Sequence, residues 1–159
     1  MKRKVLVNFC LIFFVSLTFL GLAQDSLPEI IKKIEPSIIV VLTYDQEGKL
    51  LGQGSGFFIN EDGEAITNRH VLEGAVRAEV KTIDGRIYSV TKIIAEDQEA
   101  DIIKIKPIIP KSQLNFLNIN PSLPKVGERI IVIGSPLGLE QTVSDGIVSA
   151  IRKIPIFGT

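Results

Sequence analysis

The chain is poor in the residues that build disulfides, zinc sites and aromatic cores. It has no tryptophan, one cysteine and one histidine among 159 residues. A single cysteine cannot form a disulfide within the chain, and the usual structural zinc sites need four Cys or His ligands. Neither Asp-Thr-Gly nor Asp-Ser-Gly occurs, so an aspartic peptidase is disfavoured. The sequence predicts no metal and no cofactor, which leaves hydroxyls, carboxylates and one imidazole, His70, to carry any chemistry.

The N-terminus has the pattern of an export signal. Met1 to Lys4 is basic, residues 5–20 are mainly apolar, and Gly21-Leu22-Ala23 supplies small residues before a cleavage point. Residues 1–23 are therefore predicted to be a cleaved signal peptide, and the mature chain to be periplasmic or extracellular. The alternative is an uncleaved membrane anchor formed by residues 5–20, although this run is short for a span of roughly 20 apolar residues.

Charge gives no reason to expect a nucleic acid partner. The whole chain has 18 basic and 18 acidic residues. Removing residues 1–23 takes away three basic residues and no acidic one, so the mature chain would carry a formal charge of −3. A mildly acidic chain does not favour binding to a phosphate backbone. The same cleavage removes Cys10, which leaves neither a thiolate nucleophile nor a cysteine ligand.

Short stretches rich in Ile, Val and Thr, separated by turn residues, predict an all-β protein. The six expected strands cover residues 37–44, 49–60, 64–68, 76–83, 86–95 and 101–106. Three glycines in the second strand predict a bulged or curved strand. Asp84-Gly85 is the strongest hairpin signal. Six strands at this spacing fit a small closed barrel, which we place at residues 36–106.

The regions flanking this barrel have different patterns. Residues 24–35 form a helical lead-in, because Ser26 is followed by Glu29 in a capping-box arrangement. Residues 107–126 contain four prolines and are predicted to be an irregular linker, with a short strand at 115–119 as an option. Residues 127–159 contain strand patterns at 129–134 and 141–153, too few to close a second barrel. We therefore expect a fragment of a longer protein.

His70 lies where a predicted strand ends and a short turn, ended by Gly74, begins. Base rates favour a hydrogen-bonded structural histidine. The polar Thr67-Asn68-Arg69 before it, and its position at a strand end, favour a side chain presented for chemistry. A neutral imidazole there could serve as a general base if an acidic partner fixes its tautomer. The residues alone leave both readings open.

Four segments in order resemble the Deg, or high-temperature-requirement, group of trypsin-like serine peptidases. They are Gly54-Ser55-Gly56-Phe57-Phe58-Ile59, Thr67-Asn68-Arg69-His70-Val71, Glu99-Ala100-Asp101-Ile102-Ile103, and the stretch from Val126 through Ile133-Gly134-Ser135-Pro136 to Ala150. The resemblance implies a trypsin-like (chymotrypsin-type) double β-barrel, with the first barrel complete and the second truncated. It makes His70 the catalytic base and Asp101 the triad acid, and it implies no cofactor.

The triad assignment makes a geometric demand. His70 and Asp101 are 31 positions apart, so they can meet only if the barrel brings two strand ends together. Asp97 is the rival acid, but Glu96-Asp97-Gln98-Glu99 has the composition of a solvated loop. The alternative role for Asp101 is a turn residue that starts a strand.

The nucleophile is the missing member. The family's G-x-S-G-G loop does not occur in the 159 residues. Ser55 lies between glycines in the first barrel, where the resemblance gives it a packing role, and Ser135 precedes Pro136 in a predicted turn. Neither has the glycines at minus two and plus two of a nucleophile elbow. The chain as it stands is therefore predicted to be inactive.

Two functions remain open. The first is a serine endopeptidase of exported or misfolded proteins, acting on unfolded or extended polypeptides and represented here by base and acid only. The second is a catalytically inactive peptide-binding module, or pseudo-peptidase, that keeps the barrel. Contact with a membrane is expected only if the signal is uncleaved. Members of the resembled group often assemble as trimers and carry a PDZ module, so the resemblance allows a homo-oligomer.

Overall fold

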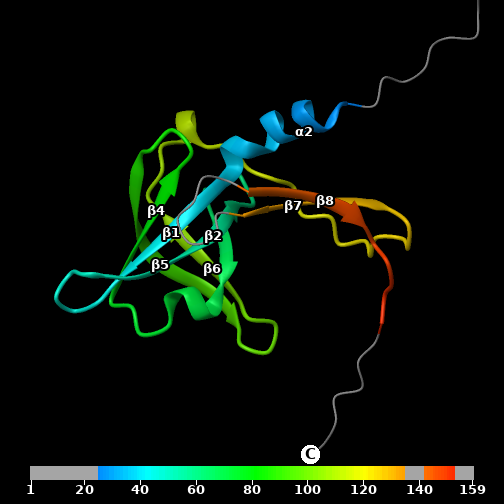
Figure 1. The fold of residues 1–159 in the computed structure, drawn as a ribbon. Coiled ribbons are helices and arrows are strands. Elements are labelled where there is room, and N and C mark those ends of the chain that lie inside the picture. The colour runs from blue at the N-terminus through cyan, green and yellow to red at the C-terminus, as the bar shows by residue number, and fades with distance from the viewer. Residues whose placement is uncertain (1–24, 135–141, 153–159) are drawn as a thin grey trace, which may run out of the picture. The chain divides into compact units, whose positions relative to one another are not determined.

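The computed structural model describes residues 25–134 and 142–152 (Figure 1). The predicted signal or anchor at residues 1–23 and the serine at position 135 lie outside these residues. The chain divides into two compact units, Met1–Ile31 and Lys32–Thr159. Within the described part, the helices are too short and too polar for any of them to cross a membrane.

The lead-in is the helix α2, Leu27–Ile34. Glu29 accepts hydrogen bonds from both the backbone N–H and the hydroxyl of Ser26, at 2.8 and 2.9 Å. The Ser26 carbonyl also accepts the first helical bond, from Ile30 N. This is the start that the capping pattern predicts. A 3₁₀ turn, η1 at Glu35–Ser37, with Pro36 near its start, follows.

Six strands form a closed barrel in the order β1-β2-β3-β6-β5-β4, so the predicted all-β class and the first barrel are confirmed (Figure 1). The strands are β1 Ile38–Tyr44, β2 Leu50–Phe58, β3 Ala65–Asn68, β4 Arg77–Thr82, β5 Ile87–Asp97 and β6 Ile102–Pro107. All barrel pairs are antiparallel. The pairing of β1 with both β2 and β4 closes the ring and leaves no exposed edge.

The alternating residues that point inward fill the barrel. The core consists of Ile39, Val41, Phe58, Ala65, Val80, Ile103 and Ile105. Phe58 is its largest fully buried side chain. Burial of one such side chain stabilises the fold by about 1.5–3 kcal/mol. The barrel interior is therefore a packed core, and only its rim can present functional side chains.

The glycine-rich strand β2 contains the predicted bulge. Leu51 is the extra residue, since Thr43 pairs with Gly52 while Tyr44 pairs with Leu50. The glycines at 54 and 56 have a different role, because they let neighbouring atoms of Val71 and Ile66 approach the backbone of β2 closely. A Cβ on Gly56 would lie 2.7 Å from a backbone oxygen of β3, a distance that real Cβ atoms do not adopt.

Apart from shifts of one or two residues at the other strand ends, three features differ from the sequence prediction. Strand β5 continues to Asp97, where a solvated loop was expected, because its end pairs with the start of β6. No strand forms at 115–119, although Leu117 N donates a hydrogen bond to the Phe58 carbonyl. The last strand, β8 at Thr142–Ile147, ends opposite Arg129 at the start of its partner strand, whereas the expected strand continued to residue 153.

Residues 107–126 are largely irregular, with one 3₁₀ turn, η3 at Lys111–Gln113. Strand β7, Arg129–Gly134, then pairs with β8 in a separate two-stranded sheet. Apolar side chains on this hairpin are exposed, with Val132 at 60% and Ile147 at 62%. Two strands leave this second sheet open, in agreement with the predicted truncation of the second barrel.

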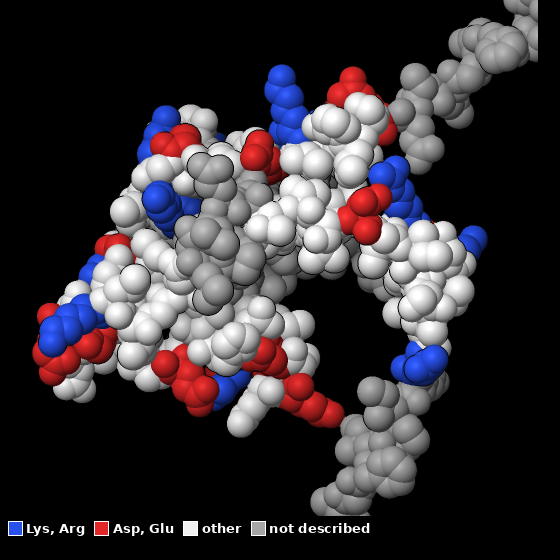
Figure 2. Space-filling view, in the orientation of Figure 1, with Lys and Arg blue, Asp and Glu red and all other residues white. Residues whose placement is uncertain are grey.

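The charges of the described residues are mixed. On the face drawn in Figure 2, acidic and basic side chains lie among one another. Several make ion pairs across neighbouring strands or turns, including Lys104 with Glu64 at 3.3 Å and Arg129 with Asp145 at 2.8 Å. An exposed pair such as Arg129 with Asp145 contributes little to stability, typically about 0–1 kcal/mol.

Candidate active site

His70 sits on a 3₁₀ turn, η2 at Arg69–Leu72, that begins directly where β3 ends. The two apolar residues after it, Val71 and Leu72, pack against the barrel core. Gly74, with φ +74°, then lets the chain turn towards β4. The turn predicted at 70–74 is therefore present, shifted by one residue. Its apolar side fixes the turn to the barrel while the imidazole stays 65% exposed.

Asp101 lies in the turn that joins β5 to β6, immediately before β6 begins. Its φ of +54° makes it the one non-glycine residue with positive φ in the described part of the chain. Aspartate tolerates this left-handed conformation better than most residues. The turn is closed by a bond from Asp101 N to the Gln98 carbonyl at 3.4 Å.

The barrel brings His70 and Asp101 into direct contact. The ring Nδ1 of His70 lies 2.6 Å from Oδ2 of Asp101, and the His70 backbone N–H donates to Oδ1 at 2.9 Å. The cause is the pairing of β3 with β6, which places Asn68 opposite Ile102. His70, which follows Asn68, therefore meets Asp101, which precedes Ile102. The geometric demand of the sequence prediction is met by this register.

These hydrogen bonds stabilise the charged form of Asp101. The pKa of its carboxyl is lowered, first by the His70 backbone N–H, then by the His70 ring, and further by the Asn68 side chain; partial desolvation opposes the shift. The carboxyl is 42% exposed. An ionised carboxylate beside Nδ1 favours a proton on that nitrogen. Nε2 is then left as the unprotonated ring nitrogen, which is the form that a general base needs.

Asn68 also contacts Asp101, a contact that the sequence did not predict. Its side-chain amide donates to both the carbonyl oxygen and Oδ2 of Asp101, each at 3.2 Å. Arg69 N donates to the same carbonyl at 3.1 Å. The position of Asn68 two residues before the histidine was the only available signal, and it does not specify a partner 33 residues away.

The neighbouring residues hold η2 in place. Thr67 is buried and its hydroxyl donates to the Ser55 carbonyl at 2.8 Å, which ties β3 to β2. A Cβ on Gly54 would lie 2.4 Å from a methyl group of Val71, so only glycine lets the turn pack this closely against β2. The Arg69 Nε lies 3.3 Å from Glu96 Oε2, close enough for an ion pair although not aligned for a hydrogen bond.

The other residues considered from sequence have different positions. Ser55 lies on β2 opposite Val40, and its carbonyl accepts the Thr67 hydroxyl. Asp97 accepts a hydrogen bond from Ala100 N at 2.9 Å, which makes it a turn-stabilising residue. The serine at position 135 lies outside the described residues. His70 and Asp101 are thus the two predicted site residues that the structure brings into contact.

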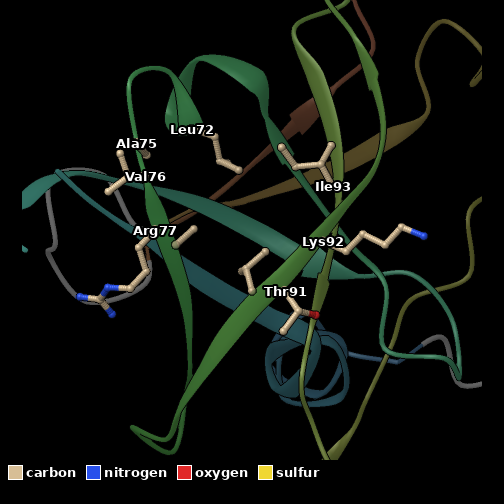
Figure 3. A pocket seen from close by; sticks show the side chains of 9 residues that line it. Leu72, Ala75, Val76, Arg77, Thr91, Lys92 and Ile93 are labelled. Atoms are coloured by element: carbon tan, nitrogen blue, oxygen red, sulfur yellow. The ribbon is translucent and has the colours of Figure 1, made fainter. Parts of the chain in front are cut away.

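A hollow of about 290 Å³ lies beside η2, between the start of β4 and the middle of β5. Figure 3 shows Leu72 and Ile93 at this hollow, with Arg77 and Lys92 extending away from each other. Neither His70 nor Asp101 lines it. Among residues 25–134 and 142–152, no group of three or more His, Cys, Asp or Glu side chains is placed to hold a metal ion.

Comparison with known proteins shows the family of the chain. The family model for a trypsin-like peptidase domain matches residues 54–157. A protein of Hahella chejuensis named "Probable periplasmic serine endoprotease DegP-like" is 37% identical over 83% of this chain and 27% of its own length. "Serine protease HTRA1" of Xenopus laevis is 35% identical over 79% of this chain and 28% of its own length.

A solved structure is similar as well. The crystal structure of the serine endoprotease from Yersinia pestis superposes with a TM-score of 0.68 at 29% sequence identity. The match covers 80% of this chain and 46% of that one. The chain therefore spans less than half of this structural neighbour and about a quarter of the two curated relatives.

Proposed function

The chain belongs to the trypsin-like peptidase family, and on that premise we propose that it carries the base and the acid of a Ser-His-Asp serine endopeptidase. The contact between His70 Nδ1 and Asp101 Oδ2 at 2.6 Å is the observation that carries the proposal. In such a device the base removes the serine proton while a carboxylate orients the ring and stabilises the imidazolium that forms. His70 is the base and Asp101 is the acid.

The steps follow from the bonds at each atom. Asp101 Oδ2 accepts a hydrogen bond from Nδ1–H, so Nε2 is available to accept the proton of an attacking serine hydroxyl. The ring becomes an imidazolium whose charge lies beside the Asp101 carboxylate. Nε2 then returns the proton to the leaving amine of the cleaved peptide. The bond from His70 N–H to Oδ1 keeps the carboxylate oriented through both transfers.

A serine nucleophile and an oxyanion hole would have to come from residues other than these 159. No G-x-S-G-G string is present, and Ser55 lies within a strand of the first barrel. We assign the substrate class as unfolded or extended polypeptides. We assign the location as the periplasm or another exported compartment, in line with relatives named periplasmic serine endoproteases.

Two measurements test the assignment. Reading the coding sequence past Thr159 separates an endopeptidase from a peptide-binding pseudo-peptidase, since G-x-S-G-G supports the first and its absence supports the second. The second measurement compares hydrolysis of an unfolded protein by the 159-residue chain and by a chain completed with a G-x-S-G-G barrel segment. Only the completed chain should cleave. Cleavage by the 159-residue chain that is lost in Ser55→Ala would show that Ser55 is a nucleophile and would overturn the assignment.

A further inference from the structure

The amide of Asn68 makes an unusual pair of contacts with a single residue. Its Nδ2 lies 3.2 Å from the main-chain carbonyl oxygen of Asp101 and 3.2 Å from Oδ2 of the same side chain. One donor group that touches both the backbone and the carboxylate of a residue restricts the torsion between them. The direction in which the Asp101 carboxylate points is therefore coupled to the position of Asn68.

Asn68 is placed where its side chain could cap η2, but it does not form that cap hydrogen bond. Asn68 is the N-cap residue of η2, with extended φ and ψ angles, where asparagine commonly accepts a backbone N–H of the following turn. No such cap bond forms at η2. The side chain is directed to Asp101 in its place. A residue needed only to start η2 would not require this orientation.

The target of these bonds is the one non-glycine residue with positive φ in the described part of the chain. Asp101 has φ +54°, and its carbonyl receives both the Asn68 amide and Arg69 N. Its Oδ2 receives the Asn68 amide and the His70 ring. Strained conformations persist where the surrounding structure determines them, often at functional sites. Asn68 and Arg69 supply that constraint from the end of β3.

We infer that Asn68 is a positioning residue that holds the Asp101 carboxylate on Nδ1 of His70 and so fixes the imidazole tautomer. This role rests on the proposed function, because the tautomer matters only if His70 acts as a base. It does not rest on burial, since His70 and Asp101 are both substantially exposed. In an exposed pair, water competes for the carboxylate, and a second donor on Oδ2 restricts its rotation away from the ring.

The single histidine allows a direct test. In the 159-residue chain, ¹⁵N chemical shifts of one imidazole report the ratio of the Nδ1–H to the Nε2–H tautomer at mildly alkaline pH, where imidazole is neutral. Asn68→Ala should lower this ratio by about three- to tenfold, the range that one hydrogen bond of ordinary strength supports. A ratio equal to that of the parent chain would overturn the role.

The matched control is Asn60→Ala. Asn60 also donates its amide to a carboxylate of the barrel, Glu64 Oε2 at 2.9 Å, but at the hairpin between β2 and β3. Its loss should lower stability without changing the His70 tautomer ratio. An equal change of the ratio in both variants would show that the tautomer follows general stability, and would contradict a specific role for Asn68.

A second measurement needs no Asn68 variant and decides the question if Asn68→Ala does not fold. In the parent chain, the Asn68 side-chain amide signals should shift as the Asp101 carboxyl is protonated, and Asp101→Asn should remove that shift. Asn68 amide signals that do not shift when the Asp101 carboxyl is protonated would overturn the inference. Hydrolysis by the completed chain is a separate readout. If Asn68→Ala changes the tautomer ratio but the completed chain does not cleave, only the proposed function is contradicted. If the ratio is unchanged and the completed chain does cleave, only the role of Asn68 is contradicted.

Discussion

The Asp101 carboxylate accepts two hydrogen bonds from His70, one from the ring Nδ1 at 2.6 Å and one from the backbone N–H at 2.9 Å. Each oxygen of the carboxylate receives one of them. The ring and the backbone of the same residue therefore fix the acid together, and a change at either residue should affect both the chemistry and the local fold.

Asp101→Asn should abolish catalysis while leaving the barrel folded. Asparagine tolerates the φ of +54° and keeps the size of the side chain, but its NH₂ group is a donor and cannot accept a hydrogen bond from Nδ1–H. In the completed peptidase we expect kcat to fall by about 10⁴-fold, the loss measured for the equivalent change in a serine peptidase triad. Steady-state kinetics with an unfolded substrate measures it. Asp101→Val is the variant for comparison with Asp101→Asn. It also removes the carboxylate, but a β-branched residue at this φ should lower the melting temperature as well.

Stability should depend on acid pH through Asp101. The pKa of its carboxyl is lowered in the fold, so the contribution is fully present above the ordinary aspartate pKa of about 3.9 and is lost as pH falls through the lowered value. Urea unfolding of the parent and of Asp101→Asn should therefore give different free energies of unfolding at neutral pH that converge in strong acid. A difference that stays constant down to that range would show that the ionised carboxylate contributes nothing.

The two close-approach glycines of β2 should differ from their neighbour Gly52. A Cβ at position 56 would meet a backbone oxygen at 2.7 Å, whereas one at position 52 finds ordinary contact at 3.5 Å. We expect Gly56→Ala to cost about 1–3 kcal/mol, as overpacking does, and Gly52→Ala to cost less. Chemical denaturation of both variants measures the difference. Equal losses would mean that the cost reflects strand entropy and not the close approach.

Gly54→Ala should act on the site and not only on stability. The added Cβ would lie 2.4 Å from a Val71 methyl, and Val71 is the residue next to His70. Displacing η2 should lengthen the contact between His70 and Asp101 and lower kcat in the completed peptidase by at least about tenfold, since small misplacements of catalytic groups are costly. A parent-like kcat in a folded Gly54→Ala variant would show that η2 is not positioned by β2.

Tyr44 should titrate above the ordinary tyrosine range. Its hydroxyl donates to Glu79 Oε2 at 2.8 Å, and this bond is the main cause of a raised pKa; partial burial adds to it, while Arg77 stacked on the ring opposes it. The contribution to stability is present below the ordinary value of about 10 and is lost as pH rises through the raised one.

Absorbance can follow this titration cleanly, because the chain has two tyrosines and no tryptophan. In Tyr88→Phe, the remaining phenol should ionise at higher pH than a free tyrosine. Adding Glu79→Gln should bring its midpoint down towards the ordinary value. A midpoint unaffected by Glu79→Gln would rule out that hydrogen bond as the cause.

The sequence predicted the barrel well because its signals are local. Alternating Ile and Val residues, with Gly63 and Gly85 at positive φ in the hairpin turns, determine where strands begin and end. The meeting of His70 with Asp101 was predictable only through family resemblance, since the β3 and β6 register that produces it is a tertiary property. The same reasoning explains why β5 was predicted too short at its acidic end: pairing with β6 overrides the polar composition.

The contacts of Asn68 at the site, unlike the meeting of His70 with Asp101, could not be predicted. The residues around Asp101 do not predict its φ of +54°. An asparagine before a turn, such as Asn68, normally indicates an N-cap. The bonds from Asn68 to Asp101 appear only once two strand ends lie side by side. The finest geometry of the site therefore depends on barrel closure, which no single segment encodes.

The central claim is that His70 is the base of a serine peptidase, and one variant tests it most directly. His70→Ala in the completed chain removes the imidazole from an exposed position at which little core packing is lost. The measurement is kcat for an unfolded protein substrate, with folding verified by circular dichroism. We expect kcat to fall by about 10⁴-fold or more in a folded variant. A folded His70→Ala variant that cleaves at the parent rate would contradict it.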